Sequence, residues 1–309
     1  MIFDVIIIGG GPCGLTASVY AMRAQLNALL IEQMSINGGQ ILSTYEVDNY
    51  PGLPKISGVE LGEKMSDHAM GLGIKKVEAN VEAIDVASDV KRVITTEGEY
   101  QAKSVILATG ASPRKLGVDG EEDLVGCGVS YCATCDGAFF KNQTVAVVGG
   151  GDVAVEDAIF LARGCEKVFL IHRRDELRAT KTLQSTLFAL ENVEVIWDSV
   201  VDSIVGDGEV EGLKIQNVKS GQITQLEVAG IFVATGNTPN SSYINEDNSE
   251  LIKCDERGFI VAGEDCATNV PGVYAGGDIR TKKLRQVVTA VADGANAINS
   301  ILEYLNDAK

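Results

Sequence analysis

Short apolar runs that end in glycine recur along this chain of 309 residues. The first covers 3–9, and similar runs cover 105–110 and 144–149, each rich in Val, Ile, Leu or Ala. Continuous apolar runs of this length are typical of strands that a parallel sheet buries on both faces. Segments with helical spacing follow the first and third runs, at 15–25 and 155–163. The alternation of buried strand and helix predicts an α/β fold.

The rest of the pattern predicts smaller elements. Helical spacing also covers 58–72 and a C-terminal segment that begins at Arg285-Gln286-Val287 and continues through 298–305. Residues 74–100 alternate enough to be strands and turns of a small antiparallel layer, and 193–230 read as short strands and turns. The run 230–236 ends in Ala-Thr-Gly, as 105–110 does. This repeat indicates two similarly built nucleotide-binding domains.

The first apolar strand runs into a glycine-rich turn with the spacing Gly-x-Gly-x-x-Gly. Gly9 allows a tight turn, Gly11 lets the backbone approach a pyrophosphate, and Gly14 lets the following helix pack closely on the strand. A second strand, 28–31, ends at the acid Glu32, about 20 residues on, where such sites bind the ribose. The turn, the helix and the acid together predict a dinucleotide site.

A second glycine-rich turn, 149–154, follows the strand 144–148 with the spacing Gly-x-Gly-x-x-Ala. The next strand ends in His172-Arg173-Arg174, and Arg178 lies four residues further on. An acid at this position would bond the ribose 2′-hydroxyl of NAD, whereas arginines accommodate a 2′-phosphate. The alternative is that these arginines only form the solvated start of a helix. The basic residues favour NADPH over NADH.

Three more stretches contain residue types that suit a flavin. Backbone glycines and an amide occur together at Gly38-Gly39-Gln40, and the loop after them carries Asn49. A late apolar strand ends in Gly276-Gly277-Asp278, where a carboxylate could bond a ribityl hydroxyl. Backbone N–H groups at the start of the last helix could bond the pyrimidine carbonyls. Each stretch taken alone is also compatible with an ordinary loop or turn.

Two cysteines two residues apart, in Cys132-Ala-Thr-Cys135-Asp136-Gly137, lie just before the second glycine-rich turn. Such a pair could be half of a zinc site, two inert buried thiols, or a disulfide that opens and closes. Zinc needs about four ligands, and the chain has no second CxxC and only two histidines, so no metal is predicted. A helix that begins at the second cysteine would lower the thiolate pKa values. Asp136 could handle the proton that leaves or enters during exchange.

Charge and cysteine content narrow the function classes. With 26 basic and 43 acidic residues the formal charge is −17, and such a surface repels nucleic acid and anionic membranes. No apolar stretch approaches the ~20 residues that span a bilayer, and Met1 runs almost directly into a strand without a cleavable leader. A cytoplasmic location is therefore expected, where structural disulfides are rare and a CxxC is more often catalytic.

Seven cysteines, an odd number, also argue against a disulfide scaffold, and Cys13 is predicted to fill a small buried position.

In their order along the chain, these motifs resemble the low-molecular-weight, bacterial-type thioredoxin reductases, and the resemblance covers essentially the whole chain. Its most specific part is the stretch 132–137. The resemblance implies two Rossmann-like, three-layer ββα domains: an FAD domain at 1–113 and 244–309, and an NADPH domain at 114–243 inserted in it. It also implies a homodimer that reduces thioredoxin. Links near 112–115 and 238–245 would let the inserted domain rotate, so that one flavin face serves both NADPH and the cysteine pair.

The resemblance also assigns residues to roles. Cys135 would face the flavin, Cys132 would attack the thioredoxin disulfide, and Asp136 would donate or accept the proton. FAD would be held by Gly9, Gly11, Pro12, Gly14, Glu32, Gln33, Gly39, Gln40, Asn49, Gly110, Gly277, Asp278, Arg285, Gln286 and Val287. NADPH would be held by Gly149, Gly151, Asp152, Val153, Ala154, His172, Arg173, Arg174 and Arg178.

Other functions of the same fold stay open at this point. Relatives of similar build take electrons from ferredoxin or oxidise small dithiols, but neither kind needs the second glycine-rich turn with its arginines. A non-catalytic NADPH sensor or flavin-binding module would not need a CxxC beside an acid. The chain departs from the family pattern at Cys13, where alanine is usual, and at Val291-Ala-Asp293-Gly294, where a glycine-rich helix start is frequent.

Overall fold

The computed structural model describes residues 1–44, 46–244 and 251–307. The chain divides into two compact units: unit 1 comprises 1–112 and 238–309, and unit 2 comprises 113–237. The chain returns from unit 2 to unit 1 after residue 237, earlier than the expected boundary at 243/244. The reason is that Tyr243 is buried in the core of unit 1, where its hydroxyl lies 3.0 Å from Thr109 Oγ1. Asn245, at the end of the expected second link, lies outside the described residues.

Unit 1 is built on a seven-stranded sheet. The long strand β6 (Gly98–Leu107) pairs in parallel with β1 (Ile2–Ile8), which is followed outward by β2 (Ala28–Glu32) and β3 (Lys75–Glu78). The end of β6 also pairs in parallel with β17 (Val273–Ala275), and its start pairs antiparallel with β5 (Lys91–Thr95), next to β4 (Val81–Asp85). The antiparallel layer expected for 74–100 therefore begins only at β4, because β3 joins the parallel part.

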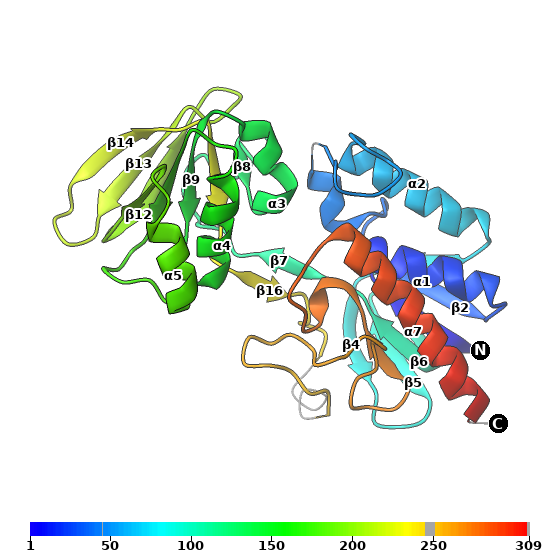
Figure 1. Cartoon of the computed structure of the whole chain (residues 1–309). Helices are drawn as coiled ribbons and strands as arrows, with labels where there is room; N and C mark the ends of the chain where they lie inside the picture. The colour runs from blue at the N-terminus through cyan, green and yellow to red at the C-terminus, as the bar shows by residue number, and fades with distance from the viewer. Residues whose placement is uncertain (45, 245–250, 308–309) are drawn as a thin grey trace. The chain divides into compact units, whose positions relative to one another are not determined.

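Helices cover one face of the parallel strands of unit 1, and the antiparallel strands cover the other. α1 (Pro12–Arg23) and α7 (Val287–Asp307) lie side by side (Figure 1) and bury Leu15, Ala297 and Ile301 with the strands. On the opposite face Ile84 and Val93 of β4 and β5 join the core. α2 (Gly58–Gly71) and the 3₁₀ helices η1 (Gly39–Ser43) and η3 (Gly277–Ile279) complete the described part of the unit.

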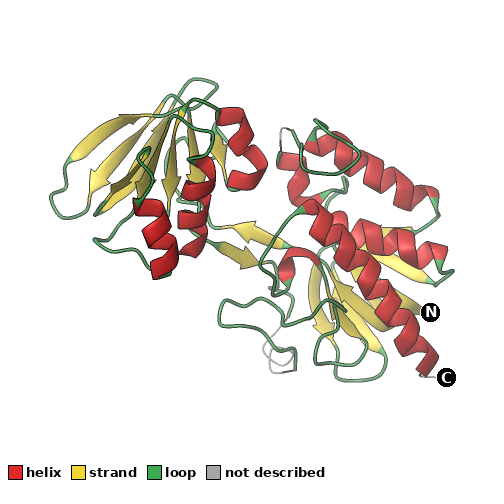
Figure 2. Ribbon diagram, viewed as in Figure 1, coloured by secondary structure: helices red, strands yellow, loops and turns green. Residues whose placement is uncertain are grey.

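Unit 2 has three layers, with its parallel sheet in the middle (Figure 2). The strand order is β11 (Val193–Ile196), β10 (Lys167–Ile171), β9 (Thr144–Val148), β15 (Gly230–Val233) and β8 (Val129–Ser130). One face packs on α4 (Asp152–Leu161) and α5 (Lys181–Phe188). The other face packs on the antiparallel sheet β12 (Ser199–Val205), β13 (Gly212–Asn217) and β14 (Ile223–Glu227). The predicted short strands of 193–230 are thus confirmed.

The two crossings between the units form a two-stranded sheet of their own. β7 (Ala111–Pro113) pairs with β16 (Asn237–Pro239), and the N–H of Arg114 donates to the carbonyl of Gly236 at 2.9 Å. In the part of the chain that the structure describes, none of the helices is both long enough and apolar enough to cross a membrane.

Candidate active site

The cysteines of the CxxC motif form a disulfide, and their Cα atoms are 5.2 Å apart. Cys132 follows strand β8 and is the N-cap of the one-turn helix α3 (Ala133–Asp136), so its carbonyl accepts the N–H groups of Cys135 and Asp136 at 3.1 Å. A helix that begins at the second cysteine, the condition considered for the sequence, is not what the structure has, because the helix starts directly after the first cysteine. Both sulfur atoms and the Asp136 carboxyl are therefore carried by one short turn.

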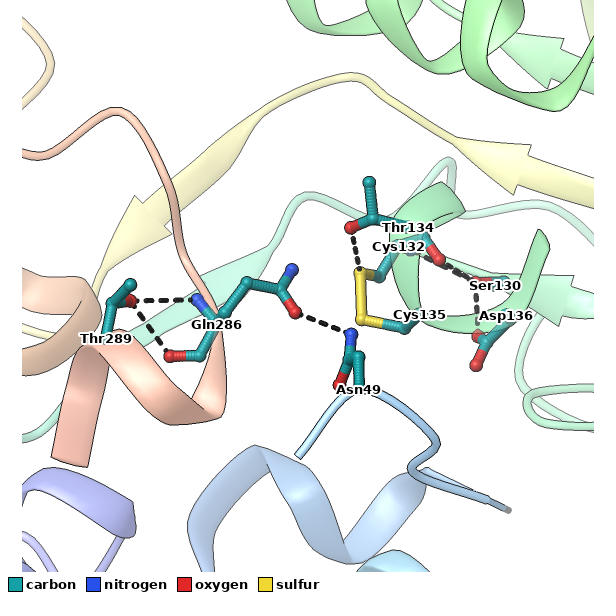
Figure 3. Close-up of a disulfide and its surroundings, with 8 residues drawn as sticks. All are labelled: Asn49, Ser130, Cys132, Thr134, Cys135, Asp136, Gln286 and Thr289. Atoms are coloured by element: carbon teal, nitrogen blue, oxygen red, sulfur yellow. Dashed lines mark hydrogen bonds between the residues drawn. A yellow bond between two sulfur atoms is a disulfide. The ribbon is translucent and has the colours of Figure 1, made fainter. Parts of the chain in front are cut away.

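Asp136 is half-buried beside this disulfide and is hydrogen-bonded to Ser130. Ser130 Oγ donates to Asp136 Oδ2 at 2.5 Å and accepts the N–H of Cys132 at 3.0 Å (Figure 3). Burial raises the pKa of Asp136, and the hydrogen bond from Ser130 lowers it by less, so the net shift is upward. A carboxyl with a raised pKa exchanges its proton closer to neutral pH, which suits an acid or base in thiol chemistry.

The glycine-rich turn of unit 2 connects β9 to α4. A Cβ atom at Gly149 would lie 2.6 Å from the carbonyl oxygen of Ala234 and 2.5 Å from Cβ of Ala154, so this position requires close packing. Gly151 is the N-cap of α4, and a Cβ atom there would meet no atom within 4 Å. The turn therefore leaves space next to the first N–H groups of the helix, as binding of a phosphate requires. Val153 of the same turn is exposed.

The basic residues after β10 lie on a loop that is fastened to this turn. Arg173, Arg174 and Arg178 are all exposed. The N–H of Arg178 donates to the carbonyl of Gly150 at 2.8 Å, and the N–H of Thr180 donates to Asp152 Oδ1 at 2.7 Å. These two hydrogen bonds fasten the backbone of the loop to the glycine-rich turn, so the three exposed arginines belong to a loop that adjoins this turn within unit 2.

His172 differs from the three arginines, because it is buried. Its Nε2 lies 3.0 Å from the carbonyl oxygen of Glu176, and a Cβ atom at Gly150 would lie 2.1 Å from its ring. Burial lowers the pKa of His172, so the imidazole is neutral at neutral pH. The ring of His172 therefore packs against the glycine-rich turn at Gly150. Only a small part of its surface is left for contact with a nucleotide.

The glycine-rich turn of unit 1 repeats this design between β1 and α1. Gly9 has φ of 108°, and a Cβ atom at Gly14 would lie 1.8 Å from the carbonyl oxygen of Gly9. Side chains at these two positions would prevent the close approach of strand and helix. At Gly11, the N-cap of α1, a Cβ atom would meet nothing nearer than 3.9 Å. Pro12 occupies the first position of the helix, where its missing N–H has no cost.

Glu32 closes the turn of unit 1 from the end of β2. Its Oε2 accepts the N–H of Gly10 at 2.5 Å and its Oε1 accepts the N–H of Met34 at 3.0 Å. Asn37, which sequence reasoning missed, lies beside Gly10, and its buried Oδ1 has no hydrogen-bond partner among the described residues. Gln33 is exposed next to Glu32. The carboxylate therefore shapes the turn, and the free acceptor of Asn37 lies next to it.

Two hydrogen bonds connect segments that carry predicted flavin-binding residues and lie far apart in the chain. Gln40 Nε2 donates to the carbonyl of Ala111, next to Gly110. Asn49 Nδ2 donates to Gln286 Oε1 at 2.9 Å, at the start of α7 (Figure 3). Gly39 and Gln40 were expected in a loop, but they begin the 3₁₀ helix η1. The structure thus joins the segments near 40 and 49 to those near 110 and 286.

Asp278 lies in the 3₁₀ turn after β17 and has a buried, unpartnered oxygen. Its Oδ1 has no hydrogen-bond partner among the described residues, and burial raises the pKa of this carboxyl. Arg285 does not pair with it through the side chain. Instead, the Arg285 guanidinium donates to the carbonyls of Asp278, Arg280 and Lys282 at 3.2–3.4 Å and stacks on Phe259 at 4.2 Å. Arg285 therefore shapes the loop that presents Asp278, with Val287 beginning the helix behind it.

The remaining cysteines do not form disulfides. Cys13 is 3 % exposed, as predicted, and burial raises its pKa well above that of an ordinary thiol. Burial also raises the pKa of Cys266 to about 12. Such thiols stay protonated and unreactive. Among the described residues, no group of three or more His, Cys, Asp or Glu side chains is arranged to hold a metal ion.

The sequence of this chain is similar to those of known redox enzymes that use a pyridine nucleotide and a disulfide. The sequence pattern of the family described as pyridine nucleotide-disulphide oxidoreductase matches residues 3–294. The chain belongs to this family. Among its relatives in the family are the thioredoxin reductases of Listeria monocytogenes, 44% identical over 100% of this chain and 95% of the relative, and of Bacillus subtilis, 42% identical over 99% and 96%.

Solved structures of family members give the same result. The thioredoxin reductase from Streptococcus pyogenes is 45% identical, covers 99% of both chains and superposes with a TM-score of 0.93. The Lactococcus lactis thioredoxin reductase in its FR conformation is 43% identical over 99% of both chains, with a TM-score of 0.67. These similarities confirm the resemblance to thioredoxin reductases and the fold class of two dinucleotide-binding domains.

Proposed function

We propose that this chain is an NADPH-dependent thioredoxin-disulfide reductase that works through FAD and the Cys132–Cys135 disulfide. The observation that carries the proposal is the disulfide itself, formed within one turn that also carries the Asp136 carboxyl. A glycine-rich phosphate turn follows it in the same unit. The chain is also 44% identical to proteins named thioredoxin reductase.

Unit 1 is the proposed FAD domain, and its residues fit the cofactor. Gly11 leaves space at the start of α1, and two buried oxygens, Asn37 Oδ1 and Asp278 Oδ1, have no partner among the described residues. A buried polar atom without a partner costs about 1–3 kcal/mol, so hydroxyl donors of a ribose or ribityl chain would satisfy these two acceptors. When bound, FAD supplies the transfer of an electron pair between a pyridine nucleotide and a disulfide.

Unit 2 is the proposed NADPH domain. The turn at 149–154 would receive the pyrophosphate, and the arginines of the attached loop would receive the 2′-phosphate. Arginine suits this task because its planar, always charged guanidinium can form two parallel hydrogen bonds to a phosphate. Ferredoxin-dependent relatives and small-dithiol oxidases would have no use for these arginines.

The chemistry at the disulfide needs one attacking sulfur, one leaving sulfur and a proton. Opening the Cys132–Cys135 bond takes up two electrons and leaves two sulfurs that need protons. Cys132 then attacks the thioredoxin disulfide and forms a mixed disulfide, and Cys135 resolves it by closing the original bond. Asp136 holds the proton that moves to and from these sulfurs. In this division of roles, which the resemblance to thioredoxin reductases implies, Cys135 acts on the flavin side and Cys132 on the substrate side.

Rotation of unit 2 about the crossings near 112–115 and 238 is part of the proposal. Two relatives of nearly equal identity to this chain, 45% and 43%, have TM-scores of 0.93 and 0.67. The lower score belongs to a structure described as the FR conformation, which supports more than one domain arrangement in the family. The short β7–β16 ribbon is the place where backbone dihedral angles would change.

We further propose that the protein is a homodimer and acts in the cytoplasm. The resemblance to thioredoxin reductases supports both statements, and the chemistry of a reversible disulfide, which suits a reducing compartment, supports the second. The net charge of −17 supports partners other than nucleic acid or anionic lipid.

Anaerobic titration of the purified FAD-loaded protein with NADPH, followed by oxidised thioredoxin, tests the function. NADPH should bleach the flavin absorbance, and thioredoxin should restore it. Failure to bleach would overturn the assignment of the electron donor, and reduced ferredoxin would be the next donor to try. Bleaching without recovery would keep the NADPH site and contradict thioredoxin as the acceptor.

A further inference from the structure

Ser130 connects the two chemical groups of the proposed active site. It lies at the end of β8, 5 % exposed, two residues before Cys132. Its hydroxyl donates to Asp136 Oδ2 at 2.5 Å and accepts the backbone N–H of Cys132 at 3.0 Å. The hydroxyl also lies 3.4 Å from the Cys132 carbonyl, but its one hydrogen favours the charged, closer carboxylate. One side chain thus touches both the backbone of the attacking cysteine and the acid.

Ser130 belongs to a strand that is hydrogen-bonded into the parallel sheet of unit 2. In the parallel pairing of β8 with β15, Ser130 lies opposite Phe232, one of the most deeply buried side chains of unit 2. The N–H of Ile231 also donates to the carbonyl of Gly128 at 2.8 Å. A hydroxyl on a strand that is anchored in this way can orient a side chain on the neighbouring one-turn helix.

We propose that Ser130 is a positioning residue that aims the Asp136 carboxyl at the cysteine pair and ties it to the backbone of Cys132. The inference rests on the proposed function. Its physical basis is that a hydroxyl donor stabilises the ionised carboxylate, whereas burial stabilises the protonated acid. Ser130 therefore lowers the pH at which the half-buried Asp136 gives up its proton, and its hydrogen bond restricts the orientation of the carboxyl.

Other charged groups near Asp136 need to be separated from this effect. α4 packs on α3 and carries Asp152, Glu156 and Asp157, and Lys141 follows the 3₁₀ helix η2 (Gly137–Phe140). None of these side chains is among the causes of the shift at Asp136, which are burial and Ser130. Asp157 needs its own control, because burial raises its pKa to about 7 and it titrates in the range of interest.

The test compares the pH dependence of thioredoxin reduction from pH 5 to 9 in the wild type, Ser130→Ala and Ser130→Thr. Ser130→Ala should lower kcat about tenfold near pH 7 and move the midpoint assigned to Asp136 up by about one pH unit, because a hydrogen bond to a charged group is lost. The KM for NADPH should stay within about twofold of the wild type. Ser130→Thr keeps the hydroxyl and should restore both the rate and the midpoint.

Three controls separate positioning from packing. Ser199 is also 5 % exposed in unit 2, but its hydroxyl donates to the backbone carbonyl of Trp197, so Ser199→Ala should leave the profile unchanged. The profile of Asp157→Asn should keep the midpoint that Ser130→Ala moves. In the Asp136→Asn background, Ser130→Ala should change the rate by less than about twofold, because the group on which Ser130 acts is absent.

Two outcomes overturn the inference: a Ser130→Ala profile that overlays that of the wild type, or an equally large effect of Ser130→Ala in the Asp136→Asn background. Failure of the proposed function looks different, because the wild-type protein itself would then not reduce thioredoxin at any pH. Thermal unfolding and flavin content of each variant show whether a lost rate comes from lost folding, and Ser130→Thr still tests the hydroxyl if the alanine variant is unstable.

Discussion

Arg280 donates two parallel hydrogen bonds to Asp293 inside unit 1, from Nη2 to Oδ1 at 2.7 Å and from Nε to Oδ2 at 2.8 Å. Lys282 Nζ and the backbone N–H of Gly277 each add a hydrogen bond to Oδ2 at 2.8 Å. Asp293 is 3 % exposed and belongs to α7, whereas its partners belong to the loop that carries Asp278. One buried carboxylate therefore fastens the proposed flavin-binding loop to the last helix.

Asp293→Asn should destabilise the protein and weaken FAD binding. The substitution removes the carboxylate that pairs with the half-buried cations Arg280 and Lys282, and the loss of one partner of a buried ion pair typically costs about 3–5 kcal/mol. The loop that presents Asp278 also loses its attachment to α7, so the dissociation constant of FAD should rise about tenfold or more. Urea unfolding and fluorescence titration of the cofactor-free protein with FAD measure the two effects separately.

The effect of Asp293→Asn should depend on pH. Burial alone would raise the pKa of Asp293, but the hydrogen bonds from Arg280 and Lys282 outweigh it and lower this pKa. The stabilisation is therefore present above the pKa of the unfolded carboxyl and is lost as pH falls through the lower pKa of the folded protein. The gap between wild type and variant should close in acid. Asp307→Asn, at an exposed position of the same helix, is the matched control, and equal stability of all three proteins at pH 7 would contradict the prediction.

Local features of the site could be predicted from the sequence because their physical cause is local. Gly9 needs a positive φ, and Gly14 needs room for a close contact one turn away, so spacing alone identifies both. The strand that precedes each turn is a continuous apolar run, and its burial follows from composition. The same is true of the CxxC motif, in which both cysteines and the acid belong to one turn.

Contacts between residues that are far apart in the sequence could not be predicted, because the local sequence pattern does not indicate which distant residues will meet. Arg280 and Asp293 read as an ordinary surface cation and a helix residue until the fold buries them together. The same holds for Asn49 and Gln286, which are 237 residues apart in sequence. Strand β3 was wrongly assigned to the antiparallel layer, because nothing in its short, polar sequence indicates that it pairs in parallel with β2. Ser130 lies close to the motif in sequence, but its role depends on the direction in which β8 places its side chain.

Replacing Arg173 and Arg174 together by alanine should reduce the preference for NADPH. Each hydrogen bond between charged groups is worth about 1.5–3 kcal/mol, so kcat/KM for NADPH should fall about 100-fold or more. NADH has no 2′-phosphate, and its kcat/KM should change by less than about threefold. Steady-state rates with the two nucleotides measure the ratio, and Arg163→Ala, an exposed arginine after α4, is the control. Equal losses for the two nucleotides would show that the arginines do not read the 2′-phosphate.

Cys135→Ser should separate the two halves of the reaction. The glycine-rich turns and the arginine loop are untouched, so NADPH should still bleach the flavin. Reduction of thioredoxin should fall below detection, because a single remaining thiol can neither accept the electron pair nor close the disulfide. Rapid-mixing absorbance and a thioredoxin assay measure the two halves. Cys127→Ser removes an exposed free thiol of the same unit and should behave like the wild type. Retained thioredoxin reduction in Cys135→Ser would contradict the assignment of Cys132 and Cys135 as the redox-active pair.

Asp157→Asn should stabilise unit 2 more strongly as the pH rises. Burial, helped by repulsion from Glu156, raises the pKa of Asp157 to about 7, whereas an unfolded aspartate has a pKa of about 3.9. Between these values the folded chain binds more protons than the unfolded chain, so the free energy of unfolding of the wild type falls as pH rises.

Asparagine carries no charge at any pH and avoids this loss. The melting temperature of Asp157→Asn should therefore match that of the wild type near pH 4 and exceed it at pH 8. Glu166→Gln, an exposed carboxyl of the same unit, should follow the wild type at both values. A melting-temperature difference between Asp157→Asn and wild type that is the same at pH 4 and pH 8 would show that Asp157 does not titrate in this window, and that its side chain reaches water in the folded protein.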